Sequence, residues 1–204
     1  MTYQVWLAYM LACWVISISP GAGAIASMSS GLNYGFRHGY WNAIGLQLAL
    51  LLQIAIVAAG VGVLFATTPW AFWGVKWFGV GYLLYLAYLQ WRAPIQPFKI
   101  QPEQPNKSIV QLVMSGFMVN ITNPKAIVFL LAVLPQFLDV SKPQWIQYVI
   151  MASTMISIDL IVMAGYTGLA AKVLRLLKSP KQQQYMNRTF AVLFSCAAGL
   201  LSLV

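Results

Sequence analysis

The stretch "NITNPKAIVF", residues 120–129, decides the fold, because it places polar residues and a proline inside a long apolar run. Asparagine is a favoured N-cap, and proline is favoured at the first position of a helix. The stretch therefore predicts a helix that begins inside the run, with Asn123 as its cap, Pro124 as its first residue and Lys125 in its first turn.

The composition around this stretch is that of a membrane protein. The chain has 204 residues, of which 60% are hydrophobic and 7% charged, against about 25% charged in soluble domains. Residues 1–36 and 39–75 carry no charged side chain, and about 20 apolar residues span a bilayer. We expect an all-α integral membrane protein with the lipid bilayer as its surroundings.

Six transmembrane helices fit the pattern of apolar runs in a single transport domain, residues 1–204. They are expected near residues 3–30, 40–66, 69–91, 109–137, 144–170 and 187–204. The loops on one side of these spans carry nine Lys and Arg residues, and the loops on the other side carry two. The positive-inside rule then places the 92–108 loop in the cytoplasm and both termini outside.

The first and fourth helices are expected to be broken. "SISPGAGAI", residues 17–25, resembles residues 120–128 in character, and Pro20 and Pro124 lie about half the chain apart. Three spans per half would make residues 1–91 and 109–204 two inverted three-helix repeats, as in many transporters. Two unrelated proline kinks are the alternative.

Half-helices that begin inside the membrane would attract anions through their N–H groups and positive dipole ends. By the same logic as at Asn123, Ser19 is expected to cap the second half of the first span and Pro20 to open it. Lys125 would add a full positive charge, which suits a carboxylate. A lysine that reaches back to the membrane surface is the alternative.

Asp159 is the other deep charge, and intramembrane acids usually face a cavity or a partner. It is a candidate proton carrier, and a static pair with Lys125 is the alternative. Asn42, Gln47 and Gln53 could line a polar path or bond across helices, and the sequence does not decide between these roles. Cys13 and Cys196 lie far apart in the sequence, so redox chemistry is not expected.

No other class of chemistry is indicated. No metal-ligand cluster is evident, so no metal or cofactor is expected, and the scattered basic residues give little support to nucleic-acid binding. An enzyme is disfavoured for the same reason.

Three motifs in order resemble one family. They are "SPGAGAI" followed by "GLNYGFRHGYWNAIGLQ", then "KWFGVGYLLYLAYLQWR", then "GFMVNITNPKAIVFLLAVLPQF". Together they resemble the lysine exporter family (LysE/RhtB) over essentially the whole chain, with wording nearest the homoserine and homoserine lactone branch. The chain departs from the family in lacking the second proline of Pro-Gly-Pro.

The resemblance implies proton-motive-force-driven efflux of amino acids or their derivatives across the bacterial inner membrane. Carried over by position, the expected substrate-binding residues are Pro20, Gly21, Asn120, Asn123, Pro124 and Lys125, and Asp159 would couple protons. A passive channel and uptake in place of export are alternatives. A homodimer is left open.

Overall fold

The computed structural model describes residues 1–67, 71–94, 107–139, 141–170 and 180–203, and these residues form helices and no strands. The helices are α1 (Tyr3–Ile18), α2 (Ala22–Gly39), α3 (Trp41–Thr67), α4 (Ala71–Arg92), α5 (Ile109–Ile121), α6 (Pro124–Ala132), the short 3₁₀ helix η1 (Leu134–Phe137), α7 (Gln144–Gly168) and α9 (Pro180–Leu203). The expected all-α class is therefore confirmed for the described residues.

Two helices in the described part are long and apolar enough to cross a membrane by themselves, over Trp41–Gly60 and Gln144–Gly168. Two helix pairs pass the same test jointly and are bent at a short break. They are α1 with α2, bent by 55°, and α5 with the segment Pro124–Phe137, bent by 56°. Within the described residues this test therefore finds two candidate spans, or up to four if each bent pair is one span.

Both predicted interruptions are present, but they are built differently. Asn123 is the N-cap of α6, Pro124 is its first residue, and Lys125 lies in the first turn, as predicted. At the first break the prediction was wrong. Ser19 ends α1 and Gly21 caps α2, so Pro20 precedes the helix instead of opening it. Residues before proline avoid the helical region, and Ser19 is accordingly extended, with ψ of 116°.

The expected boundaries were wrong at two further places. The first span was expected to end near residue 30, but α2 continues to Gly39. Gly35 has a φ of +74°, which glycine adopts without a steric penalty, so the chain kinks there and the helix resumes. The last helix begins at Pro180 instead of residue 187, in keeping with the preference for proline at helix starts.

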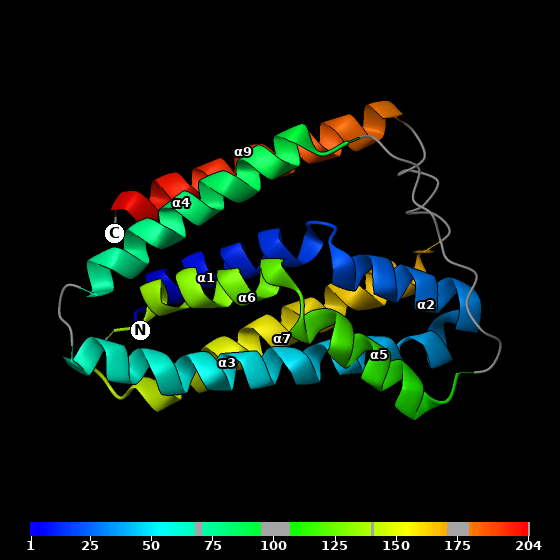
Figure 1. The fold of residues 1–204 in the computed structure, drawn as a ribbon, viewed down its shortest axis with the longest axis horizontal. Helices are drawn as coiled ribbons and strands as arrows, with labels where there is room; N and C mark the ends of the chain where they lie inside the picture. Colours follow the sequence, from blue (N-terminus) through cyan, green and yellow to red (C-terminus); the bar gives the residue numbers. More distant parts are fainter. Residues whose placement is uncertain (68–70, 95–106, 140, 171–179, 204) are drawn as a thin grey trace.

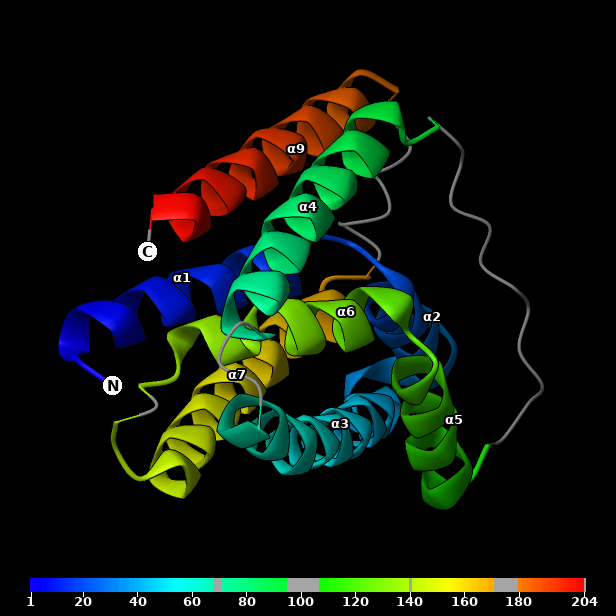
Figure 2. The same ribbon diagram turned by 60° about the vertical axis from the view of Figure 1, so that its left-hand side comes forward.

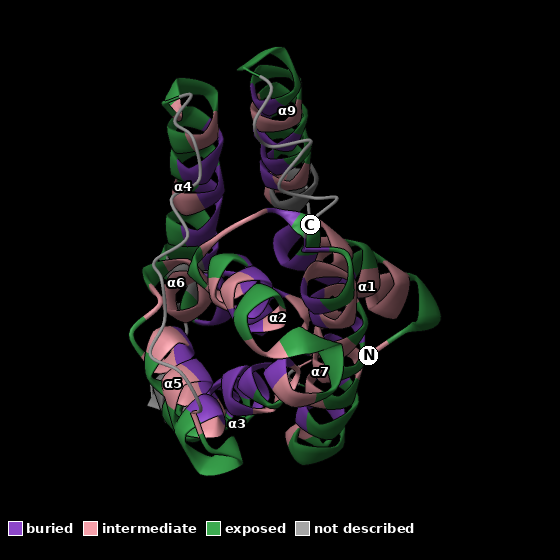
Figure 3. Cartoon of the chain, turned by 90° about the vertical axis from the view of Figure 1, so that its right-hand side faces the viewer, coloured by how far each residue is buried: buried purple, intermediate pink, exposed green. Residues whose placement is uncertain are grey.

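The helices form a bundle with one pair set to the side. Figures 1 and 2 show α4 and α9 alongside each other, with α1 and α6 beneath them and α3, α5 and α7 beyond. Figure 3 shows exposed residues along α4 and α9. The exposed apolar side chains of α4 include Trp73, Trp77 and Phe78. Such an apolar outer surface suits contact with lipid.

The core lies where α1, α3, α6 and α7 meet. Tyr9, Leu50, Leu130 and Met151 are each at most 1% exposed there. The hydroxyl of Tyr9 donates to the carbonyl of Met151 at 3.1 Å, so its polar group is satisfied within the core. This packing holds the broken helix α1 against the continuous helix α7.

Glycines allow the closest helix contacts. A Cβ on Gly45 would overlap the carbonyl of Val113, and a Cβ on Gly116 would overlap the carbonyl of Asn42. The backbones of α3 and α5 therefore touch at two reciprocal points. Small residues at helix interfaces permit this close approach in membrane proteins.

Candidate functional site

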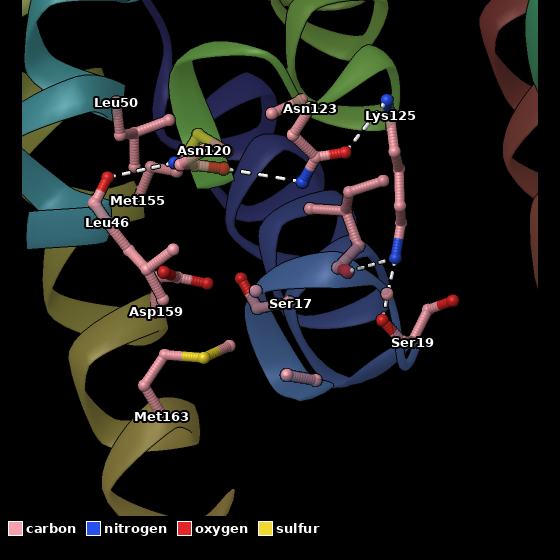
Figure 4. Close-up of a pocket in the computed structure, with 15 residues that line it drawn as sticks. Ser17, Ser19, Leu46, Leu50, Asn120, Asn123, Lys125, Met155, Asp159 and Met163 are labelled. Carbon is pink, nitrogen blue, oxygen red and sulfur yellow. Dashed lines mark hydrogen bonds between the residues drawn. The ribbon is translucent and has the colours of Figure 1, made fainter. Parts of the chain in front are cut away.

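A cavity lies where the two helix breaks meet, and Figure 4 shows the side chains around it. Its volume is about 60 Å³, room for several water molecules. Of the residues expected from sequence, Gly21, Asn120, Asn123, Lys125 and Asp159 line it. The structure thus brings together five positions that lie as far as 138 residues apart in the chain.

The two prolines do not line the cavity. Pro20 and Pro124 stand at the breaks themselves, and the carbonyl of Pro124 accepts a hydrogen bond of 3.3 Å from the Tyr82 hydroxyl of α4. Their geometric effect is on the backbone, since proline fixes φ and removes an N–H donor.

Lys125 reaches from α6 to the end of α1. Its ammonium donates hydrogen bonds to the carbonyl oxygens of Ile16, at 3.0 Å, and Ser19, at 2.6 Å. The last carbonyls of a helix lack intrahelical partners and carry its negative dipole end. The side chain therefore runs inward rather than to the membrane surface. An ammonium has three donors, and two are accounted for by these bonds.

The start of α2 is open to the cavity. Its N-cap, Gly21, offers no side-chain hydrogen bond to the first turn. Gly21, Gly23 and Ala24 all line the cavity. A Cβ on Gly21 would come within 3.7 Å of the Lys125 nitrogen. An uncapped helix start beside an ammonium group makes this side of the cavity electropositive.

The side chains of Asn120 and Asn123 form hydrogen bonds to backbone groups and to each other. The Asn123 side-chain oxygen accepts from the Lys125 backbone N–H at 3.1 Å, and its nitrogen donates to the Asn120 side chain at 3.3 Å. Asn120 in turn donates to the carbonyl of Leu46 on α3 at 2.8 Å. These bonds fix the shape of the second break against α3.

Asp159 occupies the opposite side of the cavity, on α7. Its Oδ2 accepts a hydrogen bond of 2.5 Å from the Gln47 side chain of α3. The Ser17 hydroxyl of α1 points toward this carboxylate in Figure 4. Among the described contacts, Asp159 and Lys125 form no ion pair, so the static pair is not what holds them in place. The cavity therefore has an acidic side and a basic side.

Sequence reasoning missed part of this site. Ser17 was not singled out, Ser19 was expected only as a helix cap, and the role of Gln47 was left undecided. Gln53, also undecided, donates to the carbonyls of Asn120, at 2.9 Å, and Ile121, at 3.5 Å, so it satisfies the end of α5. The available signal was the presence of two glutamines in an otherwise apolar span, since buried polar groups require partners.

Comparison with known proteins identifies the family. The model of the LysE type translocator family matches residues 14–203, so the chain belongs to this family of translocators. It is a multi-pass protein of the bacterial inner membrane.

Three relatives illustrate the range of the family. An uncharacterized membrane protein of Vibrio cholerae is 41% identical, with 99% of this chain and 98% of the relative covered. A homoserine/homoserine lactone efflux protein of Salmonella typhimurium is 39% identical over the same shares. A leucine efflux protein of Enterobacter sp. is 29% identical, over 96% of this chain and 94% of the relative. No solved structure matches the chain.

Proposed function

We propose that this protein exports amino acids or close derivatives from the cytoplasm, with homoserine, homoserine lactone and threonine as the leading substrates. The relatives named for homoserine, homoserine lactone and leucine efflux support this class of cargo. The observation that carries the proposal is the cavity at the two helix breaks, where Lys125 and Asp159 face a common space within apolar helices.

The architecture that we propose for transport is a single domain, residues 1–204, of six spans in two inverted repeats, residues 1–91 and 109–204. Bends of 55° and 56° at equivalent places in the two halves support it. In transporters of this kind, substrate binds where interrupted helices meet, and access alternates by movement of one part against the other.

The binding residues follow from the two breaks. Pro20 and Gly21 shape the first break, and Asn120, Asn123 and Pro124 shape the second, while Lys125 offers a donor to the substrate carboxylate. The two bonds that Lys125 makes to α1 leave one of its three donors for this purpose. The N–H groups at the start of α2 add to the attraction for an anion.

We assign proton coupling to Asp159. Asp139 lies outside the helices, in the loop between η1 and α7, so among the described acids only Asp159 lies within a span. A carboxylate that binds a proton in one orientation and the substrate in the other would exchange the two across the membrane. The proton gradient then drives efflux, because a proton enters for each release of cargo from this carboxylate.

Reconstituted protein in proteoliposomes tests the proposal. Homoserine should accumulate against its gradient when the pH gradient favours it, and accumulation should collapse with a protonophore. A passive channel would equilibrate the substrate without accumulation, and an uptake system would respond to the opposite gradient. Cross-linking in native membranes would decide whether the working unit is a homodimer.

A further inference from the structure

We infer that the acidic side of the cavity is a specific site for the substrate's primary ammonium group, built by Asp159, Ser17 and Gln47. This inference rests on the proposed function and adds which substrate group is recognised first. It predicts that the amine, rather than the carboxylate, is the group that every good substrate must have.

The unpaired acceptors at this side carry the inference. Ser17 is 6% exposed and lines the cavity. Its hydroxyl points toward the Asp159 carboxylate, and its oxygen receives no hydrogen bond from a donor in the described part of the chain. The side-chain oxygen of Gln47, also 6% exposed, is likewise unpaired there. Buried polar atoms without partners are rare and costly. Of the two, only Ser17 lines the cavity with Asp159, so a donor for its oxygen would come from a ligand that enters there.

Gln47 has a second role, as a positioning residue. Its nitrogen holds Oδ2 of Asp159 at 2.5 Å and thereby fixes the orientation of the carboxylate. The Ser17 hydroxyl lies between this carboxylate and the Lys125 side in Figure 4. A ligand that enters here meets the negative charge of Asp159 and the hydroxyl oxygen of Ser17. A primary ammonium, with three N–H donors and a positive charge, matches that set.

The opposite, basic side of the cavity suits the carboxylate of the substrate. A carboxylate at the start of α2 would sit beside Lys125 while the ammonium is at Asp159, so a zwitterionic amino acid is complementary to both sides. Homoserine and its lactone share the primary amine, but only homoserine has a carboxylate. A site that requires the amine therefore accepts both, and a site that requires the carboxylate rejects the lactone.

A set of four ligands tests this on the unmodified protein. Counterflow of labelled homoserine in proteoliposomes is measured against homoserine, homoserine lactone, 4-hydroxybutyrate, which lacks the amine, and N-acetylhomoserine, whose amine is blocked. We expect the lactone to compete, and the two ligands without an ammonium to be at least about tenfold weaker, since a charged hydrogen bond is lost. Competition by 4-hydroxybutyrate as strong as that of the lactone would overturn the inference.

Ser17→Ala tests the site directly. This variant should weaken the binding of homoserine and of the lactone by a similar factor, about fivefold to tenfold. The reason is that the lost acceptor serves the ammonium group that both ligands share. Thr167→Val is the matched control, since Thr167 is 2% exposed and its hydroxyl is also unpaired but lies outside the cavity. This control should leave the apparent affinities for homoserine and for the lactone within about twofold of those of the unmodified protein. A change confined to homoserine would place Ser17 at the carboxylate and contradict the inference.

A sodium site is the competing explanation for a cluster of oxygen acceptors. Counterflow in choline chloride should equal that in sodium chloride if the ligand is the substrate's ammonium, and a strict requirement for sodium would overturn the inference.

Failure of the ammonium site can be distinguished from failure of the proposed function. If the protein exchanges N-acetylhomoserine as well as homoserine, efflux stands and the ammonium site is wrong. If it exchanges none of the ligands or other amino acids, the proposed function itself fails.

Discussion

The ammonium nitrogen of Lys125, in the first turn of α6, lies 2.6 Å from the carbonyl oxygen of Ser19, at the end of α1. One side chain thus joins the two helix breaks, although 106 positions separate these residues in sequence. The bond satisfies a carbonyl that the helix itself cannot pair. Lys125 is consequently both a support for α1 and a charge beside the cavity.

Lys125→Ala should lower the thermal stability of the purified protein and weaken transport of carboxylate substrates more than that of lactones. The carbonyls of Ile16 and Ser19 lose their donor, at a cost of about 3 kcal/mol for two charged hydrogen bonds. The selectivity change should be about one order of magnitude. Thermal unfolding in detergent and transport of homoserine and its lactone at matched expression measure the two effects.

Lys125→Met is the companion variant, because it keeps most of the side-chain volume and removes the charge. It should reproduce the loss of selectivity. Equal loss of both substrates in both variants would show that Lys125 acts only through the support of α1.

Asp159→Asn should abolish accumulation driven by the pH gradient while the protein still folds and inserts. Asparagine has nearly the same shape and can still accept the hydrogen bond from Gln47, but it does not carry a proton. Accumulation of homoserine in proteoliposomes and the unfolding temperature are the measurements. Accumulation by the variant at the wild-type level would remove Asp159 from the coupling step.

Asp139→Asn is the control for this variant. Asp139 lies in the loop before α7, where hydrogen bonds from Ser141 and the neighbouring Lys142, at 3.2 Å, lower the pKa of its carboxyl to about 2. A depressed pKa contributes stability that is present above the unfolded-state value and lost only as the pH falls through about 2. Asp139 therefore stays ionised between pH 5 and 8, because even pH 5 lies roughly three units above this pKa. Its replacement should not change proton coupling.

Gly116→Ala should impair the packing of α3 on α5. The new Cβ would overlap the carbonyl of Asn42, and overpacking of this kind costs about 1–3 kcal/mol. Gly199→Ala in α9 is the matched control, since a Cβ there meets nothing within 4 Å and alanine favours the helix. The unfolding temperatures should separate, with Gly116→Ala below the wild type and Gly199→Ala at or above it. Equal values would show that the two backbones do not touch.

The topology prediction concerns the sides of the membrane. Reporter fusions after residue 100 should be cytoplasmic, and fusions at the C-terminus should be periplasmic, because the excess of Lys and Arg lies in one set of loops. A cytoplasmic C-terminus would contradict the six-span arrangement.

Local rules predicted the second break almost residue by residue. Asn123, Pro124 and Lys125 take the cap, first and first-turn positions because helix-start preferences act over a few neighbouring residues. The same rules failed at Ser19 and Pro20. There the end of α1 is completed by Lys125, a partner distant in the sequence, and the extended residues between the two helices leave Gly21 as the cap.

The acidic side of the site shows the same limit. Asp159 was found from sequence because one charge in an apolar span is conspicuous. Ser17 was not found and the role of Gln47 stayed undecided, since Ser17, Gln47 and Asp159 come from three different helices and meet only when these pack. A serine in a small-residue segment such as 17–23 carries no local mark of a binding role.

The contact of α3 with α5 has a consequence for movement. Where Gly45 and Gly116 bring the two backbones together, no side chains remain between the helices to repack as they slide. Gln53 of α3 also holds the end of α5, and Asn120 of α5 holds Leu46. We therefore expect α3 and α5 to move as one rigid unit that carries one wall of the cavity, so that a displacement of α3 would also move the second helix break.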